Sequence, residues 1–123
     1  MKTEELYTFD ENHPVPDLGV IDINTVKKGG GSDLFIIVAT PLQADRRSLE
    51  RLLRKVEVYL EFLNTEEFRK ESGVATADNT NIIVRIHPDS DPRAFDLLER
   101  NRQWVKNNNA NLVVNANPLE SVN

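Results

Sequence analysis

His87, Asp89 and Asp91 bring one imidazole and two carboxylates into a stretch of five residues. These groups bind divalent cations, and they directly follow an apolar run that is expected to be a strand. Because open α/β sheets bind ligands at the carboxyl edges of their strands, this is the best candidate for a metal or small-molecule site. A structural interpretation accounts for the same residues, since Pro88 ends the strand and Asp91 caps the next helix. We favour the structural interpretation and keep the site as an alternative.

A second candidate is a row of basic residues on a long predicted helix. Arg47, Arg51 and Lys55 are spaced by four, which places them on one helix face. Such a ridge could bind an acidic partner or a phosphate. Alternatively, Glu50 pairs with the arginines four residues away on either side, and the rest of the ridge is a solvated face.

Trp104 is the one tryptophan of the chain, and it lies out of phase with the apolar stripe of its predicted helix. An exposed tryptophan would be a natural anchor for a partner. Partial burial against the two helices is the default interpretation.

Other motifs of catalysis or cofactor binding are missing from the sequence. Gly29-Gly30-Gly31-Ser32 precedes a strand, so it predicts a hairpin loop and not a phosphate-binding loop. No G-x-S-x-G motif occurs, although a catalytic triad can assemble from distant segments. There is no cysteine to act as a nucleophile, a disulfide partner or a thiolate ligand. We predict no catalytic residues and no cofactor.

The composition indicates a single acidic domain. The chain has 123 residues, 20 acidic and 15 basic, with a net charge of −5. Five of the acidic residues and one basic residue lie within residues 1–19, so the remainder is nearly neutral. This balance disfavours nucleic acid and anionic membranes as partners. The longest apolar run, Leu34 to Ala39, is too short to cross a bilayer, and we expect a cytoplasmic protein.

Hydrophobic periodicity predicts four strands and two main helices. The strands are expected over residues 20–26, 34–40, 82–87 and 112–115. Asp45 caps a long amphipathic helix, and Thr65 begins a short helical turn that stops at Gly73. Asp91 caps a second main helix, which ends at Lys106.

The predicted order of elements is ββαβαβ, one hairpin followed by two strand-helix-strand units. Because such units cross over right-handedly, both helices lie on one face of a four-stranded mixed sheet. The fold class is therefore α/β (α+β), a two-layer sandwich. The domain covers residues 19–117, with an acidic N-terminal arm over residues 1–18 and a C-terminal tail over residues 118–123.

The sheet face without helices is expected to be half apolar and half polar. Strand alternation places on it a set that we take as a candidate binding surface: Asp22, Phe35, Ile37, Ile83, Arg85 and His87. Asn24, Val113 and Asn115 are expected on the same face. A partner, a second copy, or the arm folding back through Leu6, Tyr7 and Phe9 should cover it.

With these elements assigned, the chain resembles a family of small uncharacterised bacterial α/β proteins, a domain of unknown function. The similarity covers roughly residues 19–116 and rests on Val20-Ile21-Asp22, the hairpin, and the helix segment from Lys55 to Leu63, which fits K-x-x-x-Y-L-x-F. The resemblance implies the same order of elements, and the family has no established activity. The chain departs from it at Thr40-Pro41-Leu42-Gln43-Ala44, where family members carry an acidic or aromatic turn.

These observations predict a non-enzymatic protein-interaction module that binds an unidentified protein, as bacterial immunity and adaptor proteins do. One alternative is a small-molecule or metal-dependent enzyme at the carboxyl edge of the strand that ends at His87. Another is a self-associating structural protein, such as a homodimer built on the half-apolar sheet face.

Overall fold

The computed structural model describes residues 9–27 and 30–116. Its strands are β1 (Ile23–Val26), β2 (Ser32–Val38), β3 (Thr80–Ile86) and β4 (Asn111–Asn115). Its helices are α2 (Arg46–Leu63), α3 (Glu66–Ser72), α4 (Pro92–Arg100) and α5 (Arg102–Asn107). The expected tail over residues 118–123 lies outside the described residues, as do Leu6 and Tyr7 of the expected arm.

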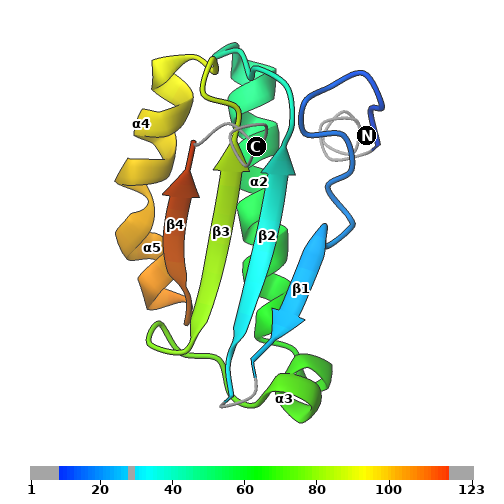
Figure 1. The fold of residues 1–123 in the computed structure, drawn as a ribbon, viewed down its shortest axis with the longest axis vertical. Helices are drawn as coiled ribbons and strands as arrows, with labels where there is room; N and C mark the ends of the chain where they lie inside the picture. Colours follow the sequence, from blue (N-terminus) through cyan, green and yellow to red (C-terminus); the bar gives the residue numbers. More distant parts are fainter. Residues whose placement is uncertain (1–8, 28–29, 117–123) are drawn as a thin grey trace, which may run out of the picture.

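The strands form one mixed sheet in the order β1-β2-β3-β4. β1 pairs antiparallel with β2, whereas β2, β3 and β4 run parallel. In Figure 1 the helices α2, α4 and α5 lie behind the sheet, and no described helix crosses its front face. The predicted two-layer architecture with a four-stranded mixed sheet is confirmed. We call the face without helices the open face.

The hydrophobic core lies between the sheet and the helices. Buried residues alternate along β2 and β3, because successive side chains of a strand point to opposite faces. Leu34, Ile36 and Val38 of β2 are at most 1% exposed. Leu52 and Val56 of α2 belong to the same core cluster and are spaced for one helix face. Each fully buried apolar side chain of this size contributes about 1.5–3 kcal/mol.

The three predicted helix starts are confirmed. Asp45 Oδ2 accepts a hydrogen bond from Ser48 N (3.1 Å), and Thr65 Oγ1 accepts one from Phe68 N (3.2 Å). Asp91 Oδ1 accepts one from Arg93 N (2.9 Å), and Pro92 occupies the first turn of α4. Each cap satisfies a backbone donor that has no partner within its helix and contributes about 1 kcal/mol.

The second main helix is interrupted, contrary to the prediction of one helix. Asn101 separates α4 from α5; its N donates to Leu98 O (3.1 Å), three residues back, and its side chain donates to Leu97 O (2.7 Å). An asparagine side chain that binds a nearby carbonyl competes with the regular helical hydrogen bond, which accounts for the tighter turn. After the break, Arg102 Nη1 donates to Leu112 O of β4 (2.5 Å).

Strand β1 is shorter than the predicted strand over residues 20–26. All four residues of β1 are exposed, and they form the edge of the sheet. The residues just before it bind α2 instead: Val20 O accepts from Lys55 Nζ (2.6 Å), and Asp22 N donates to Tyr59 Oη (2.7 Å). The start of the predicted strand therefore attaches β1 to the long helix.

Two glycines of the β1–β2 hairpin offer a matched test of its packing. Both have positive φ, but a Cβ on Gly31 would lie 2.0 Å from Asn79 O, whereas a Cβ on Gly30 would meet nothing within 4 Å. We expect Gly30→Ala to lower the unfolding free energy by about 1–2 kcal/mol through its backbone conformation alone. Gly31→Ala should cost at least about 2 kcal/mol more, because the backbone has to move. Urea unfolding measures both losses, and equal losses would contradict this packing.

Candidate binding surface

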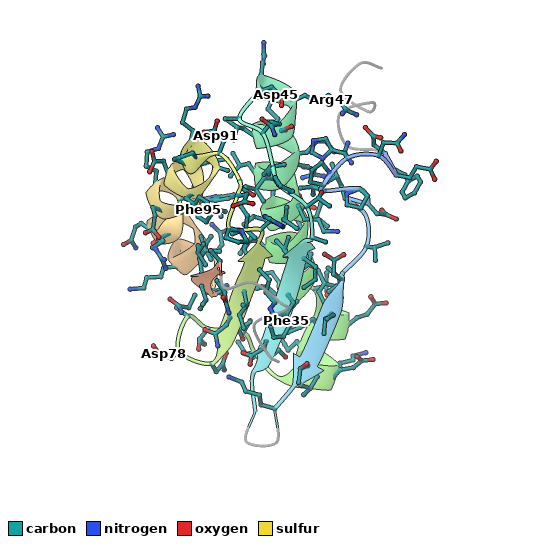
Figure 2. The ribbon with its side chains drawn as sticks, turned by 45° about the horizontal axis from the view of Figure 1, so that its top comes forward. Phe35, Asp45, Arg47, Asp78, Asp91 and Phe95 are labelled. Carbon is teal, nitrogen blue, oxygen red and sulfur yellow. The ribbon has the colours of Figure 1, made fainter. Side chains whose placement is uncertain are left out.

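One apolar row crosses all four strands on the open face. The register aligns Ile23 of β1 with Phe35 of β2. It then aligns Phe35 with Ile83 of β3, and Ile83 with Val113 of β4. Ile23 is 46% exposed and the other three are partly exposed. Figure 2 shows Phe35 over the sheet. We call these four residues the apolar row.

A polar row lies next to the apolar row, toward the amino ends of β2, β3 and β4. It consists of Asp33, Asn81 and Asn111, which we call the Asp33 row. Asn81 Nδ2 donates to Asp33 Oδ1 (2.9 Å), and Asn111 Nδ2 donates to Asn81 Oδ1 (3.2 Å). Lys27 Nζ lies 3.6 Å from Asp33 Oδ1. The row is thus ordered by its own hydrogen bonds and exposes carboxylate and amide oxygens.

A third row lies on the other side of the apolar row, toward the carboxyl ends of the same strands. It consists of Ile37, Arg85 and Asn115, which we call the Arg85 row. Arg85 is partly exposed, and its guanidinium has no hydrogen bond or ion pair within the described part of the chain. A cation that lies beside apolar side chains without a counter-ion is well placed to bind a carboxylate.

Four of the six predicted residues of the open face are brought together there: Phe35, Ile37, Ile83 and Arg85. His87 lies just beyond β3; its N donates to Val38 O (3.1 Å), and its Nδ1 accepts from Asp89 N (3.0 Å). The imidazole is therefore at the edge of this surface and is partly exposed.

The placement of Asp22 on the open face was wrong. Its carboxylate accepts from Ile37 N (3.0 Å) at the edge of β2 and from Lys55 Nζ (3.2 Å) on the helix side. Strand β1 begins at Ile23, which pairs with Phe35, so no residue of β1 pairs with Ile37. The Asp22 carboxylate accepts the hydrogen bond of Ile37 N in place of a strand residue. Asn24 was also misplaced, because it pairs with Leu34, whose side chain is buried under the helices.

Sequence reasoning missed four residues of this surface, Ile23 and the members of the Asp33 row. In β1 every residue is exposed, so its polarity pattern does not report which face is inward. The polar residues of the Asp33 row lie at strand ends, where a sequence pattern alone suggests loops. Only the register between strands aligns them.

The basic ridge of α2 is not a solvated surface. Arg51 and Lys55 are 0% and 1% exposed. Arg51 Nε and Nη2 donate to Val15 O (3.0 and 2.8 Å), and burial lowers the pKa of its guanidinium. Lys55 Nζ donates to the carbonyls of Asp17 and Val20 and pairs with Asp22. The expectation of an exposed ridge is therefore wrong for these two residues.

Arg47, the third member of the ridge, pairs with Asp10 (Nη2 to Oδ2, 2.9 Å), and this contact lowers the pKa of the Asp10 carboxyl. The ridge thus binds residues 10–22 of its own chain. Glu50 pairs with Arg46 as predicted, whereas Arg54 pairs with Glu57 and Glu61. Phe9, the described one of the three apolar arm residues Leu6, Tyr7 and Phe9, is 62% exposed.

Tyr59 connects the same segment to the sheet. Its hydroxyl accepts from Asp22 N (2.7 Å) and donates to Phe35 O (2.5 Å), while its ring is fully buried. Burial raises the pKa of this hydroxyl, which stays protonated and can donate. One side chain therefore joins α2, β2 and the residue that precedes β1.

His13, Ser48 and Asp45 form a hydrogen-bonded chain with the residue types of a catalytic triad. His13 Nε2 lies 2.9 Å from Ser48 Oγ, and Ser48 Oγ donates to Asp45 Oδ1 (2.7 Å). His13 Nδ1 accepts from Val15 N (2.9 Å), so Nε2 carries the proton of the neutral ring. A general base has to accept the serine proton, and here Asp45 accepts it. These hydrogen bonds therefore cap α2 and fix the position of His13. They do not activate the Ser48 hydroxyl as a nucleophile.

The alternative metal ligands at the His87 edge do not gather into a site. No group of three potential metal-binding side chains forms among the residues described, which include His87, Asp89 and Asp91. Asp91 caps α4 and pairs with Arg93 (3.1 Å), which lowers the pKa of its carboxyl. Figure 2 shows Asp91 at the start of α4, apart from Asp45 and Arg47 at the start of α2.

Trp104 is partly buried against the core, as the default interpretation predicted. It lines a shallow groove of about 340 Å³ between α2 and α5. Glu57 and Glu61 also line the groove, and both bind Arg54 Nη1 (2.8 and 3.2 Å). The carboxylates of the groove are therefore already neutralised in part by a residue of the same helix.

Comparison with protein-family models, with curated proteins and with solved structures found no match. The resemblance to the family of small bacterial α/β proteins therefore stays a prediction. None of the described helices is both long and apolar enough to span a bilayer.

Replacing Lys55 tests the attachment of residues 17–22 to α2. Lys55→Met leaves two carbonyls and the Asp22 carboxylate without their cation, so we expect the unfolding free energy to fall by about 2–4 kcal/mol. Arg46→Met is the control, because its side chain is 90% exposed in its pair with Glu50, and it should cost less than about 1 kcal/mol. Urea unfolding compares the two variants. Similar losses would show that the contacts of Lys55 do not hold the segment.

Protonation of His13 should weaken the fold. Burial and the nearby Arg51 and Arg47 lower its pKa below the ordinary value of 6.5. The unfolded chain therefore takes up the proton at a higher pH than the folded chain, and the unfolding free energy should fall as the pH drops below about 6.5 toward the lowered folded pKa. Urea unfolding between pH 7.5 and 5.5 should show a smaller decline for His13→Asn than for the wild type.

The matched control is His87→Asn, which leaves the contacts of His13 in place and should keep the decline of the wild type. If His13→Asn declines as steeply as the wild type, the coupling between the His13 proton and folding is refuted.

Proposed function

We propose that this protein is a non-enzymatic protein-binding module whose binding surface is the open face. The observation that carries this proposal is the position of Arg85, a partly buried guanidinium without a counter-ion in the described residues, next to an apolar row that spans the sheet. The core lies on the opposite face, so side chains on the open face are not needed to fill it.

This arrangement favours a particular kind of partner. Apolar side chains that exclude water strengthen a charge-assisted hydrogen bond at their margin, and arginine is enriched where interfaces bind most strongly. The partner surface should therefore present a carboxylate flanked by apolar side chains. Immunity and adaptor proteins act by masking such a surface without any chemistry, and we propose this class, in the cytoplasm, for the present chain.

Reversing the charge of Arg85 tests the proposal. In a pull-down from lysate of the native host, Arg85→Glu should reduce capture of a stoichiometric partner at least tenfold relative to the wild type, because a carboxylate would then face a carboxylate. Arg69→Glu is the matched control, since Arg69 is an exposed residue of α3. Circular dichroism and thermal unfolding establish that both variants fold. Equal capture by Arg85→Glu and Arg69→Glu would refute the open face as the binding surface.

A further inference from the structure

The three rows of the open face are self-complementary. The apolar row lies in the middle, the Asp33 row on one side and the Arg85 row on the other. We infer that the partner of this face is a second copy of the same chain, in a twofold dimer whose facing strands run in opposite directions. This inference rests on the proposed function, because it uses the same surface.

The geometry follows from the spacing of strands and sheets. Adjacent rows are two residues apart, or about 6.6 Å along the strands, and facing sheets pack about 10 Å apart. A twofold axis parallel to the apolar row reverses the strands and exchanges the two outer rows. Arg85 of each copy then lies over Asn81 of the other, one strand, or about 4.8 Å, from Asp33. The two apolar rows stack on each other.

The groups that meet in this dimer are chemically matched. The guanidinium of Arg85 has five donors and no described partner. Across the interface it meets the Asp33 row, where Asp33 Oδ1 accepts from Asn81, while Asp33 Oδ2 accepts no hydrogen bond within the described residues. Each dimer contains this Arg85–Asp33 contact twice, because the interface is symmetric.

The other face-to-face arrangement is unfavourable. A twofold axis parallel to the strands would keep the strand direction and would place the Arg85 row of one copy against the Arg85 row of the other. Guanidinium would then face guanidinium in one outer row and carboxylate would face carboxylate in the other, and such opposition of like charges costs several kcal/mol in other interfaces. The charge distribution therefore selects the antiparallel dimer.

The expected dimer is weak. Four strands about 4.8 Å apart and five residues of about 3.3 Å each give a contact of about 300 Å² per copy in projection, below that of a standard stable interface. We therefore expect a dissociation constant on the order of 10–100 µM, and a population of dimer that depends strongly on concentration.

A charge exchange between two variants tests the inference. Sedimentation equilibrium of the full chain from 5 µM to 1 mM should show the wild type and the control Arg69→Glu approaching a dimer. Arg85→Glu and Asp33→Arg should each raise the dissociation constant at least tenfold, because each homodimer opposes like charges twice. An equimolar mixture of the two variants should dimerise with nearly the affinity of the wild type. In the mixed dimer the introduced glutamate meets the introduced arginine, and the native Asp33 of one variant meets the native Arg85 of the other.

Circular dichroism establishes that both variants fold. If Asp33→Arg does not fold, Asp33→Asn replaces it, and its mixture with Arg85→Glu still restores one of the two contacts and should dimerise more tightly than Arg85→Glu alone.

A wild type that stays monomeric at 1 mM overturns the second copy as the occupant, and a mixture that stays monomeric overturns the antiparallel geometry. If the wild type is monomeric while Arg85→Glu loses a captured protein, the dimer is refuted and the proposed function stands; if neither self-association nor Arg85-dependent capture is seen, both fail.

Discussion

The buried cations Arg51 and Lys55 of α2 hold the segment from Val15 to Asp22 against the body of the protein. This segment contains no described helix or strand, so its carbonyls lack the partners that regular structure supplies. Burying a cation also costs free energy unless its hydrogen-bond donors find acceptors. The carbonyls of the segment and the cations of α2 therefore stabilise each other, and both are hydrogen-bonded only when the segment lies along α2.

The edge of the sheet depends on this attachment. It places Val15 and Leu18, each 1% exposed, in the core cluster, and it sets Asp22 where its carboxylate accepts from Ile37 N. Tyr59 adds a link from α2 to the backbone of Phe35. At the other end of the segment, the chain from His13 through Ser48 to Asp45 caps α2. The polar contacts of the first described residues thus build the sheet edge and the start of α2.

These contacts and the hydrophobic core lie on the helix side of the sheet. The side chains of the open face are therefore not needed to fill the core. Its rows are nevertheless ordered: the apolar row lies in the middle, the hydrogen-bonded Asp33 row on one side, and the Arg85 row on the other. A sheet with one face in the core can carry such a pattern at little cost to stability, since those side chains remain in contact with water. This separation between the folding face and the open face is the basis of the proposed binding function.

The sequence by itself determined the order of elements, the helix caps at Asp45, Thr65 and Asp91, and the shared face of Phe35, Ile37, Ile83 and Arg85, because these follow from local hydrogen bonding and from strand alternation in β2 and β3. Only the tertiary structure decided the face of β1 and the position of Asp22, because an edge strand exposed on all its residues has no inward pattern. It also decided that Arg51 and Lys55 are buried. The carbonyls that bind them lie 35 to 38 residues away in the chain, and no periodicity within a helix reports a partner at that distance.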